Sequence, residues 1–292
     1  MRVRWRDAPT GGVRLNVLEF TLLVWISSAT AGFLGALTGL GGGVVLVPLL
    51  TLVFGVDIRY AIGASLVSVI ATSSGAASAY VKEGYTNLRL GMFLEVATTF
   101  GAIAGATIAA FVSTRILAVV FGFVLLYSAH LSRQSRPEHS ADTPPDRLAT
   151  RLKLNSTYPT QSGEQPYNVH AVPVGFSLMF VAGVLSGLLG IGSGALKVLA
   201  MDQFMRIPFK VSTTTSNFMI GVTAAASAGV YLKRGYIDPG LAMPVMLGVL
   251  LGALLGAKVL VKARVGVLRN IFSLVIVLLA IQMIYNGFTG RI

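Results

Sequence analysis

The sequence predicts an all-α polytopic membrane protein made of two homologous repeats, each with about four transmembrane helices and a glycine-broken re-entrant half-helix. Three observations support this prediction. The chain is strongly apolar, with 54% hydrophobic and only 12% charged residues and a mean hydropathy of +0.76, outside the range of soluble domains. Its apolar segments have the lengths of membrane helices. A second set of segments repeats the spacing of the first.

Ten apolar segments divide equally between the two halves of the chain. Those of the first half cover residues 15–38, 43–56, 58–81, 88–112 and 115–131. Those of the second half cover residues 172–190, 194–205, 209–232, 239–262 and 267–288. Most have about 20 residues, which a helix needs to cross a hydrocarbon core of roughly 30 Å. We expect the first segment to be a retained helix, because no small-residue cleavage site and soluble domain follow it.

The two halves align when the sequence is shifted by 151 positions. Residues 31–47 then lie over residues 182–198, with 8 of 17 identical, and the register continues without a gap through the polar motifs YVKEGY and YLKRGY. Apolar composition alone would not keep this register. We therefore expect a first transmembrane repeat at residues 1–131 and a second at residues 171–292. The hydrophilic stretch between them, residues 132–170, is predicted to be a flexible linker.

The second segment of each half is too short to cross a membrane as a helix. With 12 to 14 residues, it rises only about 18 to 21 Å, so we interpret it as a half-helix that returns from a break. A re-entrant segment would make the repeats parallel, with both termini and the linker in the cytoplasm, and the positive-inside rule favours this arrangement. A spanning segment would make the repeats inverted, and the sequence leaves both arrangements open.

Glycines gather immediately before these short segments. The first break contains Gly41, Gly42 and Gly43, and the second contains Gly192, Ser193 and Gly194. Neighbouring glycines weaken a helix, and unwound backbone at membrane depth is tolerated where it is buried by protein or lines a cavity. The amide groups that begin the following helix favour anions. We therefore expect these residues to line an anion site; the alternative is that they only allow helices to pack closely.

Polar side chains on the next helix of each half are the candidates to complete this site. Ser65 and Thr72 belong to the first half, and Ser216 and Asn217 to the second. Their hydroxyl and amide groups can hydrogen-bond the oxygens of an anion. The alternative is that hydroxyl groups in membrane helices bond to carbonyls of their own helix.

Charged residues inside the apolar segments are few, and such residues are functional candidates because they are costly to bury. Lys197 follows the second break by three residues and could supply a positive charge to the anion; the alternative is that it extends to the membrane interface. Glu95 and Asp202 are candidate proton carriers, with ion pairing or interface exposure as the alternative for each.

Several functions are not expected from this sequence. The absence of cysteine excludes disulfides and thiolate chemistry, and there is no motif for a metal site, a cofactor or catalysis. The net charge of +12 does not indicate nucleic-acid binding, because most basic residues flank apolar segments and anchor helix ends. The expected partners are a small anion and the lipid bilayer, and a homodimer is left open.

The motifs GFLGALTGLGGGVVLVPLL, AIGASL and SGAASAYVKEGYTNLRLG resemble those of the TauE/SafE family of sulfite and organosulfonate exporters. The resemblance covers nearly the whole chain except the termini and the linker. It implies a transporter of the exporter type that moves small sulfur-containing anions across a bacterial inner membrane by alternating access between the repeats. An anion channel, or a transporter of another small organic anion, is the alternative. The second repeat departs from the pattern, with Leu199 at the position that matches Pro48.

Overall fold

The computed structural model describes residues 16–38, 42–82, 84–133, 146–160, 163–260 and 265–292. It is mostly helical, in agreement with the predicted all-α membrane class. The helices of the first half are α1 (Val17–Thr38), α2 (Gly43–Leu52), α3 (Ile58–Lys82), α4 (Leu88–Ala109) and α5 (Thr114–Arg133). Those of the second half are α7 (Val172–Leu189), α8 (Gly194–Leu199), the π-helical turn η1 (Ala200–Phe204), α9 (Phe209–Lys233), α10 (Pro239–Leu260) and α11 (Val265–Thr289).

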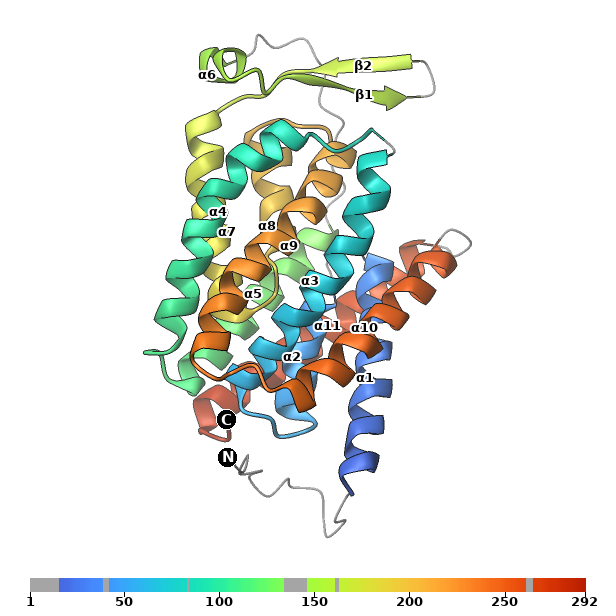
Figure 1. Cartoon of the computed structure of the whole chain (residues 1–292), viewed down its shortest axis with the longest axis vertical. Helices are drawn as coiled ribbons and strands as arrows, with labels where there is room; N and C mark the ends of the chain where they lie inside the picture. The colour runs from blue at the N-terminus through green and yellow to red at the C-terminus, as the bar shows by residue number, and fades with distance from the viewer. Residues whose placement is uncertain (1–15, 39–41, 83, 134–145, 161–162, 261–264) are drawn as a thin grey trace.

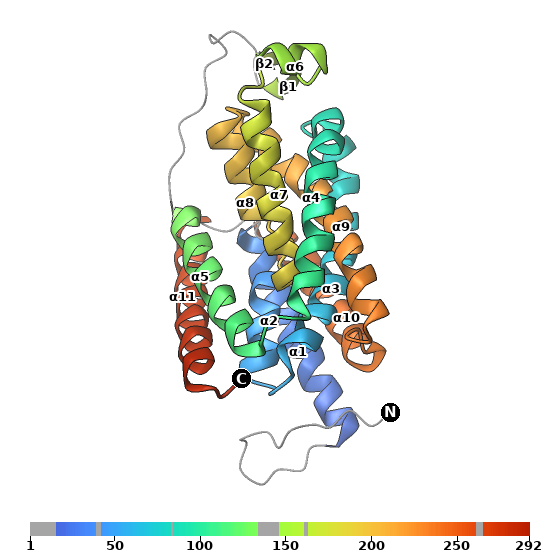
Figure 2. The same cartoon turned by 90° about the vertical axis from the view of Figure 1, so that its left-hand side faces the viewer.

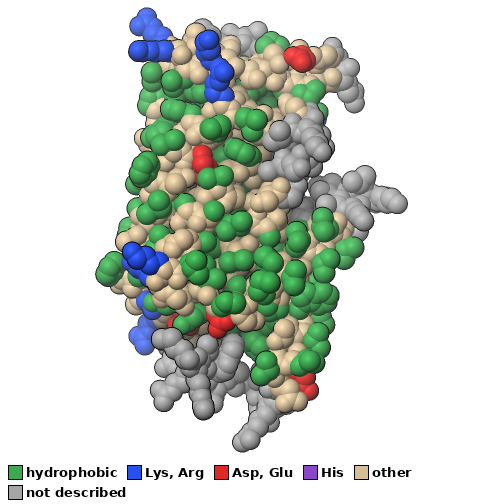
Figure 3. Space-filling model, viewed as in Figure 1, with side chains coloured by type: hydrophobic (Ala, Val, Ile, Leu, Met, Phe, Trp, Pro, Cys, Tyr) green, Lys and Arg blue, Asp and Glu red, His purple; other side chains and the backbone are tan. Residues whose placement is uncertain are grey.

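Four helices in the described part of the chain are long and apolar enough to cross a membrane. Their apolar stretches are Val17–Gly35, Leu88–Ala109, Val172–Leu189 and Pro239–Gly256. The outer surface carries large apolar side chains, such as Phe100 on α4 and Leu255 on α10, which are 66% and 58% exposed. Figure 3 shows hydrophobic side chains over much of one face, with basic side chains near its ends. This surface fits a lipid environment, so the chain is a multi-pass membrane protein.

The helices pack in pairs that join the two halves. Helix α1 packs against α10, α4 against α7, and α5 against α11, while α3 lies against α9 in the middle (Figures 1 and 2). Glycines let these helices approach closely: a Cβ atom on Gly183 of α7 would overlap the backbone of Thr98 in α4, and one on Gly101 of α4 would overlap the carbonyl oxygen of Phe180. The halves are therefore interleaved rather than separate bodies.

Each short helix returns to the end of the molecule from which the preceding long helix started. The rings of Phe20, near the start of α1, and Phe54, just after α2, are 5.7 Å apart between centroids. In the second half, the amide of His170, just before α7, donates to the carbonyl oxygen of Met205, just after η1, at 3.1 Å. Both pairs of helices thus run inward to a glycine break and back.

The positions of the C-terminus and the linker differ from what the sequence predicts. Thr114 at the start of α5 donates to the carbonyl oxygen of Ile292 at 3.4 Å, so α5 begins beside the C-terminus. It then runs away from that end, and the hairpin of the linker lies at the opposite end (Figures 1 and 2). The prediction that both termini and the linker lie on one side is therefore wrong.

The second half of the linker is folded, which differs from the flexible linker that the sequence predicts. It contains helix α6 (Arg147–Arg151) and the strands β1 (Ser156–Thr160) and β2 (Gly163–Tyr167), which pair antiparallel. Leu154, Tyr167 and Val169 are buried in one cluster with residues of α4 and α7. The side-chain amide of Asn87, which caps α4, donates to the carbonyl oxygen of Leu154 at 2.9 Å and to the hydroxyl of Tyr167 at 2.8 Å. A few apolar residues within this polar stretch are thus enough to hold the linker hairpin against α4 and α7.

Candidate functional site

The glycine breaks of the two halves meet near the middle of the bundle. Ser65 of α3 donates from its hydroxyl to the carbonyl oxygen of Gly190 at 2.9 Å, directly before the second break. A Cβ atom on Gly43 would lie 2.8 Å from the same hydroxyl oxygen and 3.2 Å from the carbonyl oxygen of Gly190. Ser65 therefore joins the start of α2 to the end of α7, where the sequence alone only suggested two separate breaks.

The second break is left-handed at three positions. Gly190 and Gly192 both have φ of 69°, and Ser193 has φ of 48°. Glycine adopts this conformation without steric cost, whereas a serine rarely does. The break also packs tightly, because a Cβ atom on Gly192 or Gly194 would lie 2.8 or 2.7 Å from side-chain atoms of Ile220. These glycines thus provide both an unwound turn and a close approach to α9.

The first break is described in part. Gly41 lies outside the described residues. Gly42 is buried, and a Cβ atom on it would lie 2.9 Å from Cγ1 of Val249 in α10. Gly43 begins α2, which continues for 10 residues. The described glycines of this break thus also allow close packing.

A polar cluster lies one turn beyond the second break. Lys197 of α8 is fully buried, and its Nζ donates to the hydroxyl of Thr223 in α9 at 2.5 Å. The Thr223 hydroxyl lies 2.6 Å from Oε1 of Glu95 in α4, to which it can donate. The Nζ of Lys197 lies 3.9 Å from the other carboxylate oxygen, Oε2. Lysine, threonine and glutamate therefore form a chain that links three helices.

Two polar atoms beside this chain are buried and lack a hydrogen bond among the described residues. One is Oε2 of Glu95, and the other is the hydroxyl oxygen of Ser193. Ser193 is one turn before Lys197, whose amide donates to the Ser193 carbonyl at 3.0 Å. Because unsatisfied buried polar atoms are destabilising, they mark a place where a ligand or a conformational change could supply a partner.

The other predicted site residues lie in different surroundings. Ser216 donates to the carbonyl oxygen of Gly194 at 3.3 Å and so contacts the second break. Thr72 donates to Ser68 and Val69 of its own helix, at 3.0 and 3.2 Å, which agrees with the alternative stated for such hydroxyls. Asn217 is half-buried on α9. Asp202 is 1% exposed on η1.

Two threonines beside Glu95, Thr98 and Thr99, were not selected from the sequence as site residues, whereas Thr223 was among the hydroxyls considered on its helix. Thr223 holds Lys197 and Glu95 together, Thr99 donates to Oε1 of Glu95 at 3.3 Å, and Thr98 lies 3.5 Å from the Thr223 hydroxyl. A signal was present, because Thr98 and Thr99 follow Glu95 at helical spacings of three and four residues and share its face. Among the described residues, no group of His, Asp and Glu side chains is placed to hold a metal ion.

Comparisons with known proteins agree with this architecture. Residues 24–283 match the family model described as sulfite exporter TauE/SafE. The chain is 30% identical to the probable membrane transporter protein YunE of Bacillus subtilis, over 92% of this chain and 99% of that protein. It is 26% identical to the probable membrane transporter protein YdhB of the same organism, over 78% and 83%. It is 28% identical to the probable membrane transporter protein MJ0441 of Methanocaldococcus jannaschii, over 75% and 77%.

No solved structure matches this chain. The family and its curated relatives are membrane transporters rather than enzymes, which agrees with the absence of a catalytic motif in the sequence. The family model covers most of the chain, including both glycine breaks and the polar cluster. The chain therefore belongs to the TauE/SafE sulfite exporter family.

Proposed function

We propose that this protein exports small sulfur-containing anions, such as sulfite or an organosulfonate, across a bacterial inner membrane. The substrate binds at the cluster of Lys197, Thr223 and Glu95, beside Ser193 and the second glycine break. The observation that carries this proposal is the fully buried Lys197. A buried lysine within a membrane bundle has an unfavourable desolvation free energy. In a transporter, its positive charge can bind an anionic substrate.

The chemistry of the cluster fits a small anion. Lys197 already has a hydroxyl and a carboxylate as partners, so the buried charges are balanced in this state. An anion with several oxygens could replace the carboxylate beside the Lys197 ammonium and accept a bond from the Ser193 hydroxyl. Charge-assisted hydrogen bonds of this kind contribute about 1.5–3 kcal/mol each.

Glu95 is the proposed proton carrier. A monoanion that enters a balanced Lys197–Glu95 pair adds one negative charge to a poorly solvated site, which is unfavourable. A proton taken from water by the Glu95 carboxylate would restore neutrality and release Lys197 for the anion. Binding and protonation would then be coupled, and one proton would accompany one monoanion. Asp202 remains a second candidate on η1.

Matched contacts support two homologous repeats with inverted orientation. Gly101 packs on Phe180, and the residues related to this pair by a shift of 151 positions, Gly252 and Ala29, also pack together. In the same way, the contact between Gly183 and Thr98 is repeated between their counterparts Gly32 and Val249. Helix α7 begins at the hairpin end and α1 at the opposite end (Figures 1 and 2). Such repeats can exchange conformations and open a central site to each side in turn.

The test combines binding and transport. Purified protein is titrated with sulfite, taurine, sulfoacetate and a carboxylate control in a thermal-shift assay, since a ligand of the native state raises its stability. Counterflow of labelled taurine or sulfite is then measured in proteoliposomes; counterflow distinguishes a carrier from a channel. We expect Lys197→Met to weaken anion binding at least tenfold, about 1.4 kcal/mol, whereas Lys197→Arg keeps part of it.

Two further variants separate charge from coupling. Glu95→Gln mimics the protonated carboxyl group, so it should retain binding but lose the response of transport to a pH gradient. Lys233→Met, at an exposed position on α9, is the matched control and should behave as the unmodified protein. Unchanged anion binding in Lys197→Met, with the folded protein recovered, would refute the proposed site.

A further inference from the structure

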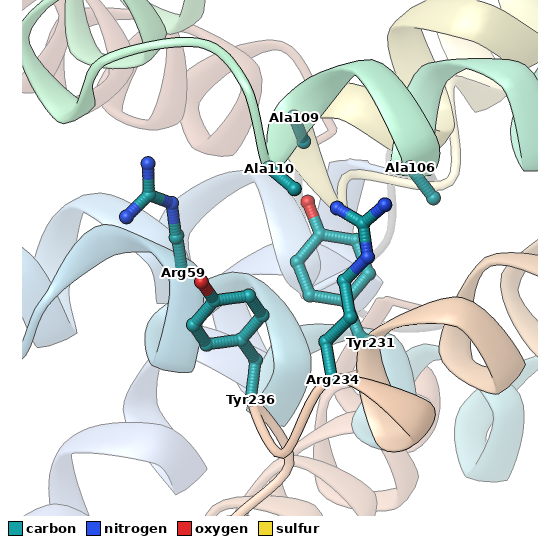
Figure 4. Close-up of a pocket in the computed structure, with 7 residues that line it drawn as sticks. All are labelled: Arg59, Ala106, Ala109, Ala110, Tyr231, Arg234 and Tyr236. Atoms are coloured by element: carbon teal, nitrogen blue, oxygen red, sulfur yellow. The ribbon is translucent and has the colours of Figure 1, made fainter.

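A second basic site lies at the end of the molecule that carries the C-terminus. A shallow hollow, open to solvent and without enclosed room for a water molecule, is lined by side chains of α3, α9, the end of α4 and the loop after α9 (Figure 4). Its polar lining consists of Arg59, Tyr231, Arg234 and Tyr236, and its apolar lining of Ala106, Ala109 and Ala110. None of these residues belongs to the Lys197 cluster.

The two arginines bond to carbonyl oxygens and have no carboxylate within ion-pair distance among the described residues. Arg59 donates from Nη2 to Val112 at 2.9 Å, and Arg234 donates from Nη1 to Thr107 at 3.3 Å. The Nε of Arg59 is buried and has no hydrogen-bond partner among the described residues. Each guanidinium group has five N–H donors. Both arginines therefore have unused donors beside the hollow and no neutralising carboxylate among the described residues.

Aromatic rings hold the two guanidinium groups in position. Arg59 lies over the ring of Tyr236, with 5.8 Å from Cζ to the centroid, and Arg234 lies over the ring of Phe111 at 5.6 Å. Figure 4 shows the Arg234 guanidinium and the Tyr231 hydroxyl on the same side of the hollow. The walls of small alanines leave the space between them apolar.

We propose that this hollow is an entrance site for a small oxyanion, which binds there before it reaches the Lys197 cluster. Guanidinium groups match the oxygens of sulfonate-like anions better than a lysine does, because their donors form a planar fork. Paired cations at the mouth also raise the local concentration of an anion. The choice of sulfite and sulfonates as ligands depends on the proposed function, whereas the anion site itself depends only on these side chains.

The repeat relates only one of the two arginines to a second cation. A shift of 151 positions relates Arg59 to Lys210 and Tyr236 to Tyr85, and Lys210 lies 5.9 Å from the centroid of the Tyr85 ring. The same shift relates Arg234 to Glu83. In sequence, the arginines at positions 59 and 234 thus correspond to a lysine at position 210 and an acid at position 83. The pair of arginines is therefore not repeated in sequence, and the proposed entrance site belongs to one side of the membrane.

The competing explanation is that both arginines only stabilise the end of α4 and the turn after it, because Arg234 contacts the Thr107 carbonyl of the last helical turn and Arg59 contacts the Val112 carbonyl beyond it, as cations at a helix C-terminus do. Substitutions distinguish the two roles. Arg59→Gln with Arg234→Gln keeps an amide donor for the carbonyls but removes both charges. Arg59→Lys with Arg234→Lys keeps both charges. Lys233→Gln, on the neighbouring exposed position, and Lys210→Gln, at the other end, are matched controls.

The measurement is counterflow of labelled sulfite into proteoliposomes at low substrate concentration and low ionic strength. We expect the double glutamine variant to lose at least tenfold in rate at low substrate concentration and to lose the salt dependence of that rate. The double lysine variant should retain most of the rate and most of its salt dependence. The control variants should transport as the unmodified protein does. A double glutamine variant that folds and transports as the unmodified protein does would overturn the entrance site.

A second experiment uses the unmodified protein, in case the glutamine variants do not fold. Phenylglyoxal modifies exposed arginines, and mass spectrometry reports each site. Methanesulfonate should protect Arg59 and Arg234 but not Arg89 at the other end, and absence of this protection would overturn the inference. Protection that persists in Lys197→Met, although that variant transports normally, would support the entrance site and refute the proposed function of the central cluster.

Discussion

At the residue scale, two serine hydroxyl groups of α3 donate hydrogen bonds to different kinds of carbonyl acceptor, although the side chains are identical. Ser65 donates to Gly190 of the other half, at 2.9 Å. Ser68 donates to Ala64 of its own helix, also at 2.9 Å. Both serines are fully buried. Only the bond of Ser65 satisfies a carbonyl at a helix break, where the backbone has no helical partner to offer.

We therefore expect Ser65→Ala to lower the stability of the folded protein more than Ser68→Ala does. The loss for Ser65 is about 1–3 kcal/mol, because the Gly190 carbonyl becomes a buried acceptor without its donor. For Ser68 the loss is below about 1 kcal/mol, since the Ala64 carbonyl can keep its bond within the helix. Thermal unfolding of both variants in the same detergent compares them. Equal losses would contradict the role of Ser65 in joining the breaks.

Several residues that were selected from the sequence lie close together in the structure, but their partners were not predicted. Lys197, Glu95 and Ser216 were selected because charges in apolar segments and hydroxyls at repeated positions are unusual. The pairing of Lys197 with Glu95 could not be predicted, because the two residues are 102 positions apart in sequence and meet only because α8 and α4 both pack against α9. Neither Arg59 nor Arg234 was selected, because basic residues beside apolar segments are normally interface anchors.

At the element scale, the contact between α4 and α7 depends on glycines that leave no room for a side chain. A Cβ atom on Gly183 would overlap backbone atoms of Thr98, which lies on the same helix as Glu95. By contrast, a Cβ atom on Gly229, within α9, would have no heavy atom within 4 Å. The two positions therefore form a matched pair for the same substitution.

We expect Gly183→Ala to destabilise the protein by roughly 1–3 kcal/mol, the usual cost of overpacking, and to reduce transport by moving α4. Gly229→Ala should be neutral or stabilising by up to about 1 kcal/mol, because alanine has the higher helix propensity. Thermal unfolding and counterflow are measured on both variants. A Gly183→Ala protein as stable as Gly229→Ala would mean that the backbone contact between α4 and α7 is absent.

The hairpin of the linker is held to the helices by Asn87 and Tyr167, and this contact has a pH dependence. Burial raises the pKa of the Tyr167 hydroxyl from 10.0 to about 12, although hydrogen bonds from Asn87 and Ser156 oppose the shift. Below pH 10 the hydroxyl is protonated in both the folded and the unfolded chain. Between pH 10 and about 12 only the unfolded chain loses this proton, so stability falls as the pH rises.

We expect Tyr167→Phe to remove this part of the alkaline loss of stability, because phenylalanine cannot ionise. The measurement is the unfolding temperature of both proteins at several pH values from 9 to 12, so that the difference between them isolates Tyr167 from other groups. The curves should approach each other as the pH rises. Parallel curves over this range would show that Tyr167 has the same pKa in both states.

At the scale of the whole molecule, the lengths and order of the helices were predictable, but their sidedness was not. The expected segments agree with the observed helices within a few residues at most boundaries, since apolar length and the polar loops define them. The distribution of basic residues favoured the parallel arrangement, whereas the position of the hairpin at the end opposite the C-terminus favours the inverted one. Several of those residues, such as Arg147 and Arg151, belong to the folded hairpin unit, whereas the positive-inside rule rests on short loops.

The inverted arrangement predicts the sides of the membrane on which three exposed residues lie. Lys233 at the end of α9 and Arg291 at the C-terminus lie at one end of the molecule, and Glu164 of the hairpin lies at the other. Because the chain has no cysteine, each single variant Lys233→Cys, Arg291→Cys and Glu164→Cys carries one thiol. In sealed spheroplasts, an impermeant maleimide should label Glu164→Cys and not the other two, or the other two and not Glu164→Cys. Labelling of all three from the same side would contradict the inverted arrangement and, with it, the alternating opening of a site that the two halves share.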